Sequence, residues 1–193
     1  LGDCGTFSFY PSKNLGAYGD AGFVTCAADD TAAVLRKLRD HGRTSKYEHQ
    51  IVGYNQRMDA LQGAILSVKL RHLDAWIAAR RRVAARYDGR LRPAGFKTIE
   101  PADGSAPVYH LYVFETSNRE EVAKALAQEG IETGIHYPLP LHLQPAFADL
   151  SKPASLPVTE RVAGRVLSLP MYPELDNEDV DRICEIVLRH ARC

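Results

Sequence analysis

The sequence predicts an α/β or α+β protein, because segments with the period of strands alternate with segments with the period of helices. Short aromatic or β-branched runs typical of strands stand at residues 6–10, 23–28 and 108–115. Between and after them, apolar residues recur every three or four positions, as they do on one face of a helix. No segment of the chain is an internal repeat of another.

The composition is that of an ordinary globular protein, with 193 residues of which 45% are hydrophobic and 25% charged. The 24 Lys and Arg residues balance 24 Asp and Glu residues, which argues against nucleic acid or a membrane surface as partner. No apolar run approaches the ~20 residues that span a bilayer, and residues 1–5 do not resemble a signal peptide. We therefore expect a cytoplasmic protein.

The four cysteines form no C-x-x-C pair and have no spacing typical of a disulfide scaffold. We expect them to be reduced thiols, in agreement with a cytoplasmic protein. They are Cys4, Cys26, Cys184 and Cys193.

The first elements are predicted as two strands, at residues 6–10 and 23–28, joined by a loop at residues 11–22 with three glycines and one lysine. A helix follows and ends near Gly42. Its N-cap is expected among Asp29, Asp30 and Thr31, and its apolar face consists of Val34, Leu35 and Leu38.

Residues 43–57 are predicted to be a long loop, and one long helix is predicted to begin at Met58. The wide apolar face of this helix indicates burial against a core or a partner chain. That face consists of Leu61, Ile65, Leu66, Val68, Leu70, Leu73 and Ile77. The basic run at residues 80–82, with Arg86 and Arg90, is expected to be a solvated face because the chain as a whole is neutral.

Residues 93–107, rich in Pro, Gly and Ala, mark a predicted boundary between two lobes. Beyond the strand at 108–115, a capping box of Ser117 and Glu120 is expected to open a helix that Gly130 closes. Residues 131–136 resemble another strand.

The last third of the chain is predicted as a proline-constrained loop at 137–144, a helix near 159–167 and a final helix that starts after Asp176 or Asn177. The residues of the final helix that should face inward are Val180, Ile183, Cys184 and Val187.

Lys13 is the first candidate functional residue, because it lies in a tight glycine-containing loop directly after a strand. A lysine amine held in such a loop can attack an aldehyde to form a Schiff base. Ser8, five residues earlier, can offer its hydroxyl to a phosphate. The residues alone leave a plain surface lysine as the alternative.

Four stretches, taken together, identify a family. Residues 7–16 (FSFYPSKNLG) with 19–22 (GDAG) closely resemble the pyridoxal-phosphate lysine segment of the DegT/DnrJ/EryC1/StrS nucleotide-sugar aminotransferases. Residues 53–62 (GYNQRMDALQ), 136–142 (HYPLPLH) and 169–173 (LPMYP) resemble three further family segments in the same order. The resemblance covers essentially the whole chain.

The resemblance implies a fold-type-I pyridoxal-phosphate-dependent transferase, similar to aspartate aminotransferase. Residues 1–92 would be the C-terminal part of the large cofactor-binding domain, with the lysine loop and the dimer helix, and residues 93–193 the small α+β domain. The family's catalytic subunit is considerably longer than this chain. The segment upstream in that subunit supplies the carboxylate that pairs with the cofactor ring nitrogen. We therefore expect a truncated chain that can be inactive alone.

The resemblance also assigns residue roles. Lys13 would bind the cofactor as a Schiff base and later move the proton, and Ser8 would hold the cofactor phosphate. Asn55 would reach the same phosphate from a neighbouring subunit, which implies a homodimer with shared sites. A helix N-cap is the alternative role for Asn55.

Substrate contacts follow from the segment Lys46-Tyr47-Glu48-His49, which resembles the branch that aminates C3 of a keto-sugar. By this resemblance Lys46 would meet the nucleotide-sugar from the partner subunit. Tyr10, His136 and Tyr137 would line the sugar pocket. For His136 and Tyr137 the alternative is a capped strand end packed against Pro138. For His142, sugar contact and a purely structural role both stay open. For Arg57, the alternative is an ion pair with an acidic residue.

The predicted function is transfer of an amino group from an amino acid, expected to be L-glutamate, to a nucleotide-linked 3-keto-deoxysugar. A 4-keto substrate is the alternative within the family. A non-catalytic dimerising or sugar-binding module is the alternative outside enzymes. A zinc site on His136 and His142 is disfavoured, because their spacing fits no ligand pattern and no cysteine lies nearby.

Overall fold

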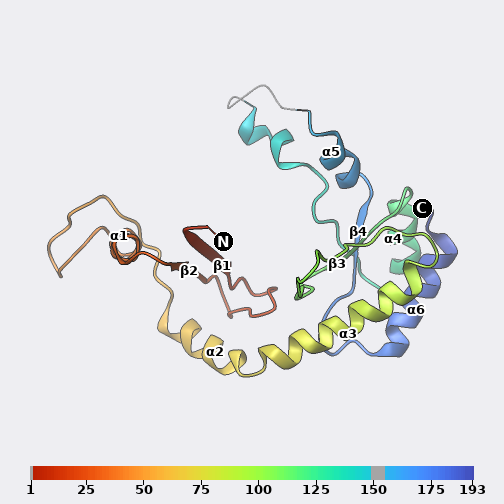
Figure 1. Ribbon diagram of the computed structural model, residues 1–193, viewed down its shortest axis with the longest axis horizontal. Coiled ribbons are helices and arrows are strands. Elements are labelled where there is room, and N and C mark those ends of the chain that lie inside the picture. Colours follow the sequence, from red (N-terminus) through yellow and green to blue (C-terminus); the bar gives the residue numbers. More distant parts are fainter. Residues whose placement is uncertain (1, 149–154) are drawn as a thin grey trace. The chain divides into compact units, whose positions relative to one another are not determined.

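The computed structural model describes residues 2–148 and 155–193, and it divides the chain into two compact units, Leu1–Asp74 and Ala75–Cys193 (Figure 1). The division falls near the start of helix α3 (Leu73–Leu91), because the later turns of α3 pack into the core of the second unit. The domains predicted at residues 1–92 and 93–193 are those of the full-length family fold. The predicted boundary between them stays a prediction.

The first unit begins with an antiparallel hairpin of β1 (Cys4–Ser8) and β2 (Gly22–Cys26). Both strands end about two residues earlier than the sequence predicted. The reason for β1 is local: Tyr10 already belongs to a turn, because its carbonyl accepts a hydrogen bond from the N–H of Lys13.

Helix α1 (Asp29–Arg39) follows the hairpin with Ala28 as its N-cap. The predicted N-cap among Asp29, Asp30 and Thr31 is therefore wrong. Asp29 and Asp30 lie in the first turn, where a negative charge interacts favourably with the helix dipole. No residue of α1 is buried within the described chain.

The single long helix predicted from Met58 is two helices, α2 (Ala60–Leu70) and α3 (Leu73–Leu91). The N–H groups of Arg71 and His72 donate to carbonyls three residues earlier, Val68 and Lys69, at 3.3 and 3.0 Å. This tightened last turn ends α2. The sequence does not reveal the break, because the apolar periodicity continues across it.

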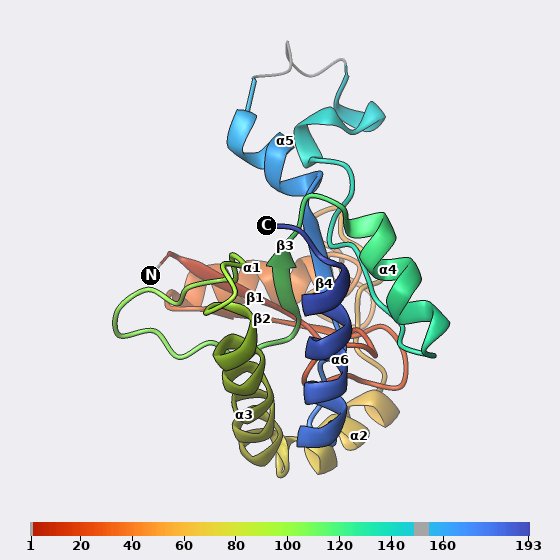
Figure 2. The same ribbon diagram turned by 90° about the vertical axis from the view of Figure 1, so that its right-hand side faces the viewer.

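The second unit holds a hydrophobic core around two antiparallel strands, β3 (Tyr112–Glu115) and β4 (Val166–Leu169). Helices α4 (Arg119–Gln128) and α6 (Asn177–His190) lie side by side next to β4 (Figure 2). The largest fully buried side chains of the core are Tyr87, Leu91, Phe114, Leu126 and Leu167.

Several element boundaries in the second unit differ from the prediction. β3 begins four residues later than expected, because Tyr109 has a left-handed backbone (φ 42°) and its carbonyl and that of His110 accept hydrogen bonds from Arg80. Residues 131–136 form no strand, only an isolated bridge between Gly134 and Ser168.

The helix predicted near 159–167 is α5 (Pro157–Ala163), and the residues after it form β4 instead. The N-cap of α4 is Asn118, so the predicted capping box of Ser117 and Glu120 is wrong. The Asn118 amide donates to Glu121 at 2.6 Å. The predicted helix closure at Gly130 is confirmed by its left-handed φ of 73°.

Helix α6 agrees with its prediction. It begins at Asn177, and the carboxylate of Asp176 accepts a hydrogen bond from the N–H of Asp179 at 2.8 Å. The four residues predicted to face inward, Val180, Ile183, Cys184 and Val187, are all buried. Within the described ranges, no helix is both long and apolar enough to cross a membrane.

Arg81, Arg82 and Arg86 are exposed, as expected of a solvated face, but Arg80 is not. Arg80 is only 8% exposed, and its Nη1 donates to the carbonyls of Tyr109, His110 and Met171 at 2.9–3.3 Å. Burial lowers the pKa of the Arg80 guanidinium, and the Glu174 carboxylate opposes that shift. Arg80 thus joins three segments of the second unit from inside the core.

Candidate active site

The loop between β1 and β2 folds into a tight turn that carries Lys13. The N–H of Lys13 donates to the Tyr10 carbonyl at 2.8 Å, which closes a four-residue turn. Phe9 closes the base of the loop twice, since its carbonyl accepts from Ala17 at 2.8 Å and its N–H donates to Ala21 at 2.9 Å. The half-buried Lys13 therefore lies on a backbone held by three hydrogen bonds.

Ser8 and Tyr10 begin the same turn. The Ser8 hydroxyl accepts a hydrogen bond from the N–H of Tyr10 at 3.3 Å. Both side chains are exposed in the described chain. One turn thus brings together three of the predicted site residues, with a hydroxyl, a phenol and an amine within six residues of sequence.

Two side chains of α2 that were not predicted as functional contact this loop. Gln62 Oε1 accepts a hydrogen bond from the N–H of Tyr18 at 2.8 Å. Lys69 Nζ donates to the carbonyl of Gly16 and lies 5.4 Å from the centroid of the Tyr18 ring. The sequence feature that could have identified them is their spacing of seven residues, which places both on one face of a largely apolar helix.

Asn55 is held by backbone pairing with the end of α1. Asp40 and Asn55 form an isolated antiparallel bridge, and the N–H of Tyr54 donates to the carbonyl of Leu38 at 2.7 Å. The N-cap of α2 is Asp59, so the alternative role of Asn55 as a helix N-cap is wrong. Its role toward a cofactor phosphate stays a prediction.

Arg57 forms an ion pair with the carboxylate of Asp40. Pairing with an acidic residue was the alternative that the sequence predicted for it. Arg43 also binds that carboxylate, at 2.7 Å. Desolvation raises the pKa of Asp40, but hydrogen bonds from Arg57 and Arg43 outweigh it and leave the pKa below its ordinary value. This ion-pair cluster anchors both ends of the long loop that contains Lys46.

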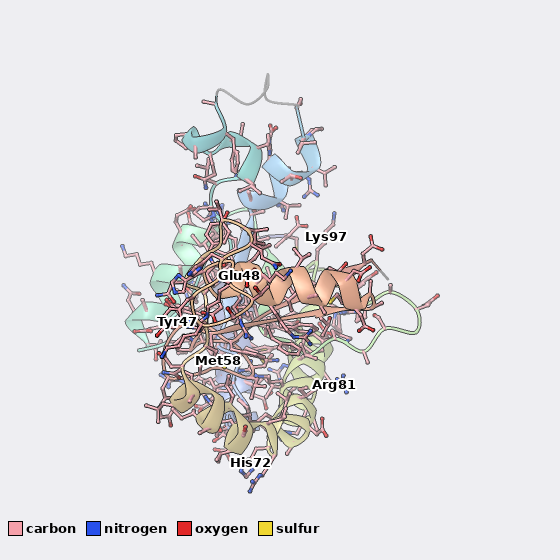
Figure 3. The ribbon with its side chains drawn as sticks, turned by 90° about the vertical axis from the view of Figure 1, so that its left-hand side faces the viewer. Tyr47, Glu48, Met58, His72, Arg81 and Lys97 are labelled. Atoms are coloured by element: carbon pink, nitrogen blue, oxygen red, sulfur yellow. The ribbon has the colours of Figure 1, made fainter. Side chains whose placement is uncertain are left out.

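Lys46 lies near the tip of that loop, which is less irregular than expected. The N–H of Thr44 donates to the carbonyl of Glu48 at 3.0 Å, so the segment turns back on itself. Lys46 Nζ lies 5.2 Å from the centroid of the exposed Tyr47 ring. Figure 3 labels Tyr47 and Glu48 on this loop. An exposed cation beside an aromatic ring suits an anionic ligand with a planar group.

His136 and Tyr137 belong to the second unit and border a cavity of about 700 Å³. The cavity lies between the proline-rich loop and α5, and its wall is largely apolar. His136 Nδ1 lies 2.9 Å from the hydroxyl of the buried Ser168 on β4, which orients the ring. Because residues 131–136 form no strand, the alternative of a capped strand end is wrong. Sugar contact by either residue stays a prediction.

His142 contacts a different group from His136. Its Nε2 lies 3.1 Å from Oε1 of Glu160, a carboxylate that also accepts the N–H of Leu156 at 3.0 Å. The hydrogen bond from Leu156, followed by that from His142, lowers the pKa of Glu160. In the part of the chain that the structure describes, no three His, Cys, Asp or Glu side chains gather as metal ligands would.

Solved structures with the same arrangement define the class of protein. DesV from S. venezuelae, in complex with a ketimine intermediate, superposes with a TM-score of 0.91 at 38% identity, over 98% of this chain and 52% of that one. NtdA from Bacillus subtilis, with bound cofactor PMP, superposes with a TM-score of 0.88 at 30% identity, over 97% of this chain and 45% of that one. The predicted fold-type-I transferase fold is therefore confirmed.

The family is shown as well. The model of the DegT/DnrJ/EryC1/StrS aminotransferase family matches residues 1–188, and the chain belongs to this family. The resemblance that the four motifs indicated is thereby confirmed. Membership, together with the cofactor bound in NtdA, supports pyridoxal phosphate as the cofactor.

Two curated relatives illustrate the similarity. One is the "Pleiotropic regulatory protein" of Geobacillus stearothermophilus, 45% identical over 100% of this chain and 53% of the relative. Another is the UDP-N-acetyl-3-dehydro-alpha-D-glucosamine 3-aminotransferase of Acidithiobacillus ferrooxidans, 43% identical over 98% of this chain and 51% of the relative. The chain spans about half the length of the curated relatives that it matches.

Proposed function

We propose that the protein is a pyridoxal-phosphate-dependent aminotransferase that moves an amino group from an amino acid to a nucleotide-linked keto-sugar. The observation that carries the proposal is the turn that holds Ser8, Tyr10 and Lys13 together, in a chain of this family. The amino donor that we propose is L-glutamate, as the family resemblance implies.

The residues of the turn fit the cofactor. Lys13 offers an amine for an aldehyde, and Ser8 offers a hydroxyl for a phosphate. The turn is also compact, since a Cβ on Gly16 would lie 2.2 Å from the carbonyl oxygen of Pro11. When bound, pyridoxal phosphate supplies an aldehyde that takes up the amine and a ring that withdraws electrons.

We assign three roles to residues of this chain. Ser8 Oγ donates a hydrogen bond to the phosphate. Lys13 Nζ would condense with the aldehyde carbon with loss of water and, once an incoming amine had displaced it, would move a proton between the substrate carbon and the former aldehyde carbon. Asn55, held by its bridge to Asp40, donates its amide to the phosphate of the neighbouring subunit.

A homodimer with shared sites is part of the proposal, and an exposed apolar face of α2 supports it. Leu61 and Val68, seven residues apart on that face, are 70% and 57% exposed, an unusual amount for large apolar side chains on one short helix. Contact with a second subunit would remove this apolar surface from water.

For the substrate we propose a 3-keto sugar. The relative from Acidithiobacillus ferrooxidans is named as a 3-aminotransferase of a 3-dehydro sugar nucleotide, at 43% identity. Lys46, His136 and Tyr137 are the proposed contacts. The ammonium of Lys46 suits the diphosphate. The imidazole of His136 and the phenol of Tyr137, at the border of the cavity, offer hydrogen-bonding groups to the sugar hydroxyls.

The test uses the natural protein that carries these residues. Borohydride reduction after addition of pyridoxal phosphate should attach the cofactor to the peptide that contains Lys13. Lys13→Ala should abolish that label, and Lys97→Ala, at an exposed position in the second unit, should leave it unchanged. A label on another lysine, or a label that survives Lys13→Ala, contradicts the proposal.

A second assay addresses the substrate. With L-glutamate and a 3-keto nucleotide-sugar, the product should gain an amine on C3, identified by mass spectrometry and NMR. An amine on C4 of a 4-keto sugar, with no turnover of the 3-keto sugar, would support the 4-keto alternative instead. A labelled protein that turns over neither sugar would indicate the non-catalytic binding module.

A further inference from the structure

Three side chains on one face of α2 correspond in order to three groups of the lysine loop. Gln62, Leu66 and Lys69 are spaced by four and three residues, so they share a face that extends over about 10 Å of the helix. Residues 16–18 of the loop present a carbonyl, a methyl group and an N–H in order. Met58 and His72, labelled in Figure 3, lie two residues before and two residues after α2.

Two backbone polar groups of this loop segment are bonded to side chains of α2. The carbonyl of Gly16 accepts from the ammonium of Lys69, and the N–H of Tyr18 donates to Gln62 Oε1 at 2.8 Å. The first bond involves a charged donor and is therefore the stronger kind. The Tyr18 ring adds a cation–π contact to the same ammonium, at 5.4 Å.

The loop and α2 each carry one apolar residue that lies, in sequence, between the two polar contacts. Ala17 and Leu66 are 1% and 7% exposed, and they are the only buried hydrophobic residues among residues 2–74. The best-packed point of the first unit is therefore located where α2 meets the loop, and not in the hairpin or in α1.

The loop's own backbone bonds hold this part of the loop at the N–H of Ala17 and the carbonyl of Ala21, both bonded to Phe9. The carbonyl of Gly16 and the N–H of Tyr18 are bonded to α2 instead, so the segment depends on both kinds of support. Glycines at 16, 19 and 22 give the free chain extra conformational freedom, which costs entropy to restrict. A Cβ on Gly19 would lie 3.1 Å from Gln62 Nε2, so glycine permits the close approach of α2.

We propose that Gln62 and Lys69 are positioning residues for Lys13. They hold the carbonyl of Gly16 and the N–H of Tyr18 and thereby fix the return half of the turn on which Lys13 lies. This inference rests on the proposed function of Lys13, because positioning matters only if the amine reacts. A misplacement of about 1 Å at a reacting group can cost about 100-fold in rate.

The first test measures the loop itself, in the natural protein without cofactor. Gln62→Met and Lys69→Met remove the polar groups and keep the length of the side chain. We expect amide hydrogen exchange in residues 14–22 to become about tenfold faster in each variant. Gln62→Glu and Lys69→Arg keep an acceptor and a donor, and exchange should stay within about threefold of the parent. Arg71→Met, which removes an exposed cation just after α2, should leave exchange unchanged.

The second test measures the reaction. Each Met variant should lower kcat about tenfold and leave KM for the nucleotide-sugar within about twofold, because the sugar contacts are elsewhere. The Glu and Arg variants should restore kcat. Unchanged exchange and unchanged kcat in both Met variants would overturn the inference. Loss of kcat in all four variants alike would also overturn it, because that result indicates general damage to α2.

The two proposals fail in different ways. If the parent protein carries no label on Lys13, the proposed function is wrong whatever the exchange rates are. If the parent is labelled and turns over its sugar but the Met variants behave like the parent, only the positioning role is wrong.

Discussion

The carbonyl oxygen of Pro11 lies 2.2 Å from the position that a Cβ on Gly16 would occupy. Real Cβ atoms essentially never approach another heavy atom closer than 3.0 Å. The two residues flank Lys13 in sequence, so their contact closes the loop around it. The tight turn therefore requires glycine at position 16.

Gly16→Ala should open the turn, because the backbone of Pro11 cannot move aside as a flexible side chain would. We expect at least a tenfold loss of borohydride-fixed cofactor on Lys13, an effect in the range that a displaced reactive group produces. Mass spectrometry of the Lys13 peptide measures it. An unchanged yield of labelled peptide would show that the turn tolerates the shift.

Gly89→Ala is the matched control for an added methyl group. Gly89 is exposed on α3 and no atom lies within 4 Å of its Cβ position. Alanine favours a helix over glycine by about 0.5–1 kcal/mol, so this variant should be slightly more stable and keep full labelling. Thermal unfolding of both variants separates loop damage from loss of the fold.

Arg80→Met should destabilise the second unit by about 2–4 kcal/mol, because three carbonyls that Arg80 satisfies would lose their donor inside the core. Urea unfolding followed by circular dichroism measures the loss. Arg82→Met, at an exposed position of the same helix, should change stability by no more than about 0.5 kcal/mol. Equal effects of the two substitutions would refute the role of Arg80 inside the core.

Acid should weaken the second unit through Asp181. Hydrogen bonding by Arg86, with the charges of Arg86 and Arg90, lowers the pKa of Asp181 below its ordinary value of 3.8. The unfolded chain then binds the proton more readily than the folded chain, so stability is present above pH 3.8 and falls as the pH drops through and below that value. Asp181→Asn should be less stable at pH 7 and should lose less stability between pH 5 and pH 3. Parallel pH curves for the two proteins would argue against this linkage.

Cys4 and Cys26 are register partners at the end of the β1–β2 hairpin. The bond from Phe9 to Ala21 makes the neighbouring pair, Ser8 and Gly22, a non-hydrogen-bonded one. Such pairs alternate along an antiparallel ladder, so Cys4 and Cys26 form one too, with Cα atoms ~4.5 Å apart. That separation lies within the range of disulfides.

Mild oxidation by glutathione disulfide should therefore join these two free cysteines, although the sequence predicted no pairing. Peptide mapping should find a Cys4–Cys26 link that Cys4→Ser abolishes. Cys184 should not compete, because burial raises the pKa of its thiol to about 12. Oxidation of both thiols without a link between Cys4 and Cys26 would contradict the strand register.

Local patterns predicted the elements whose determinants are contiguous in sequence. The final helix, α6, agreed because its cap Asp176 and its inward residues form one unbroken pattern. The start of β4 was predicted as the end of a helix, because a four-residue strand with three apolar residues has no distinctive period. The break after α2 was missed because the apolar stripe continues across Arg71 and His72.

By itself, the sequence determined the family and the residues of the lysine turn, because both depend on short contiguous segments such as residues 7–16. Only the tertiary structure decided which distant groups meet. Examples are Lys69 with Gly16, His136 with Ser168 and Arg80 with Met171. The physical reason is that hydrogen bonds between segments form wherever folding brings an unsatisfied backbone group next to a donor or acceptor, and the period of the chain does not record that proximity.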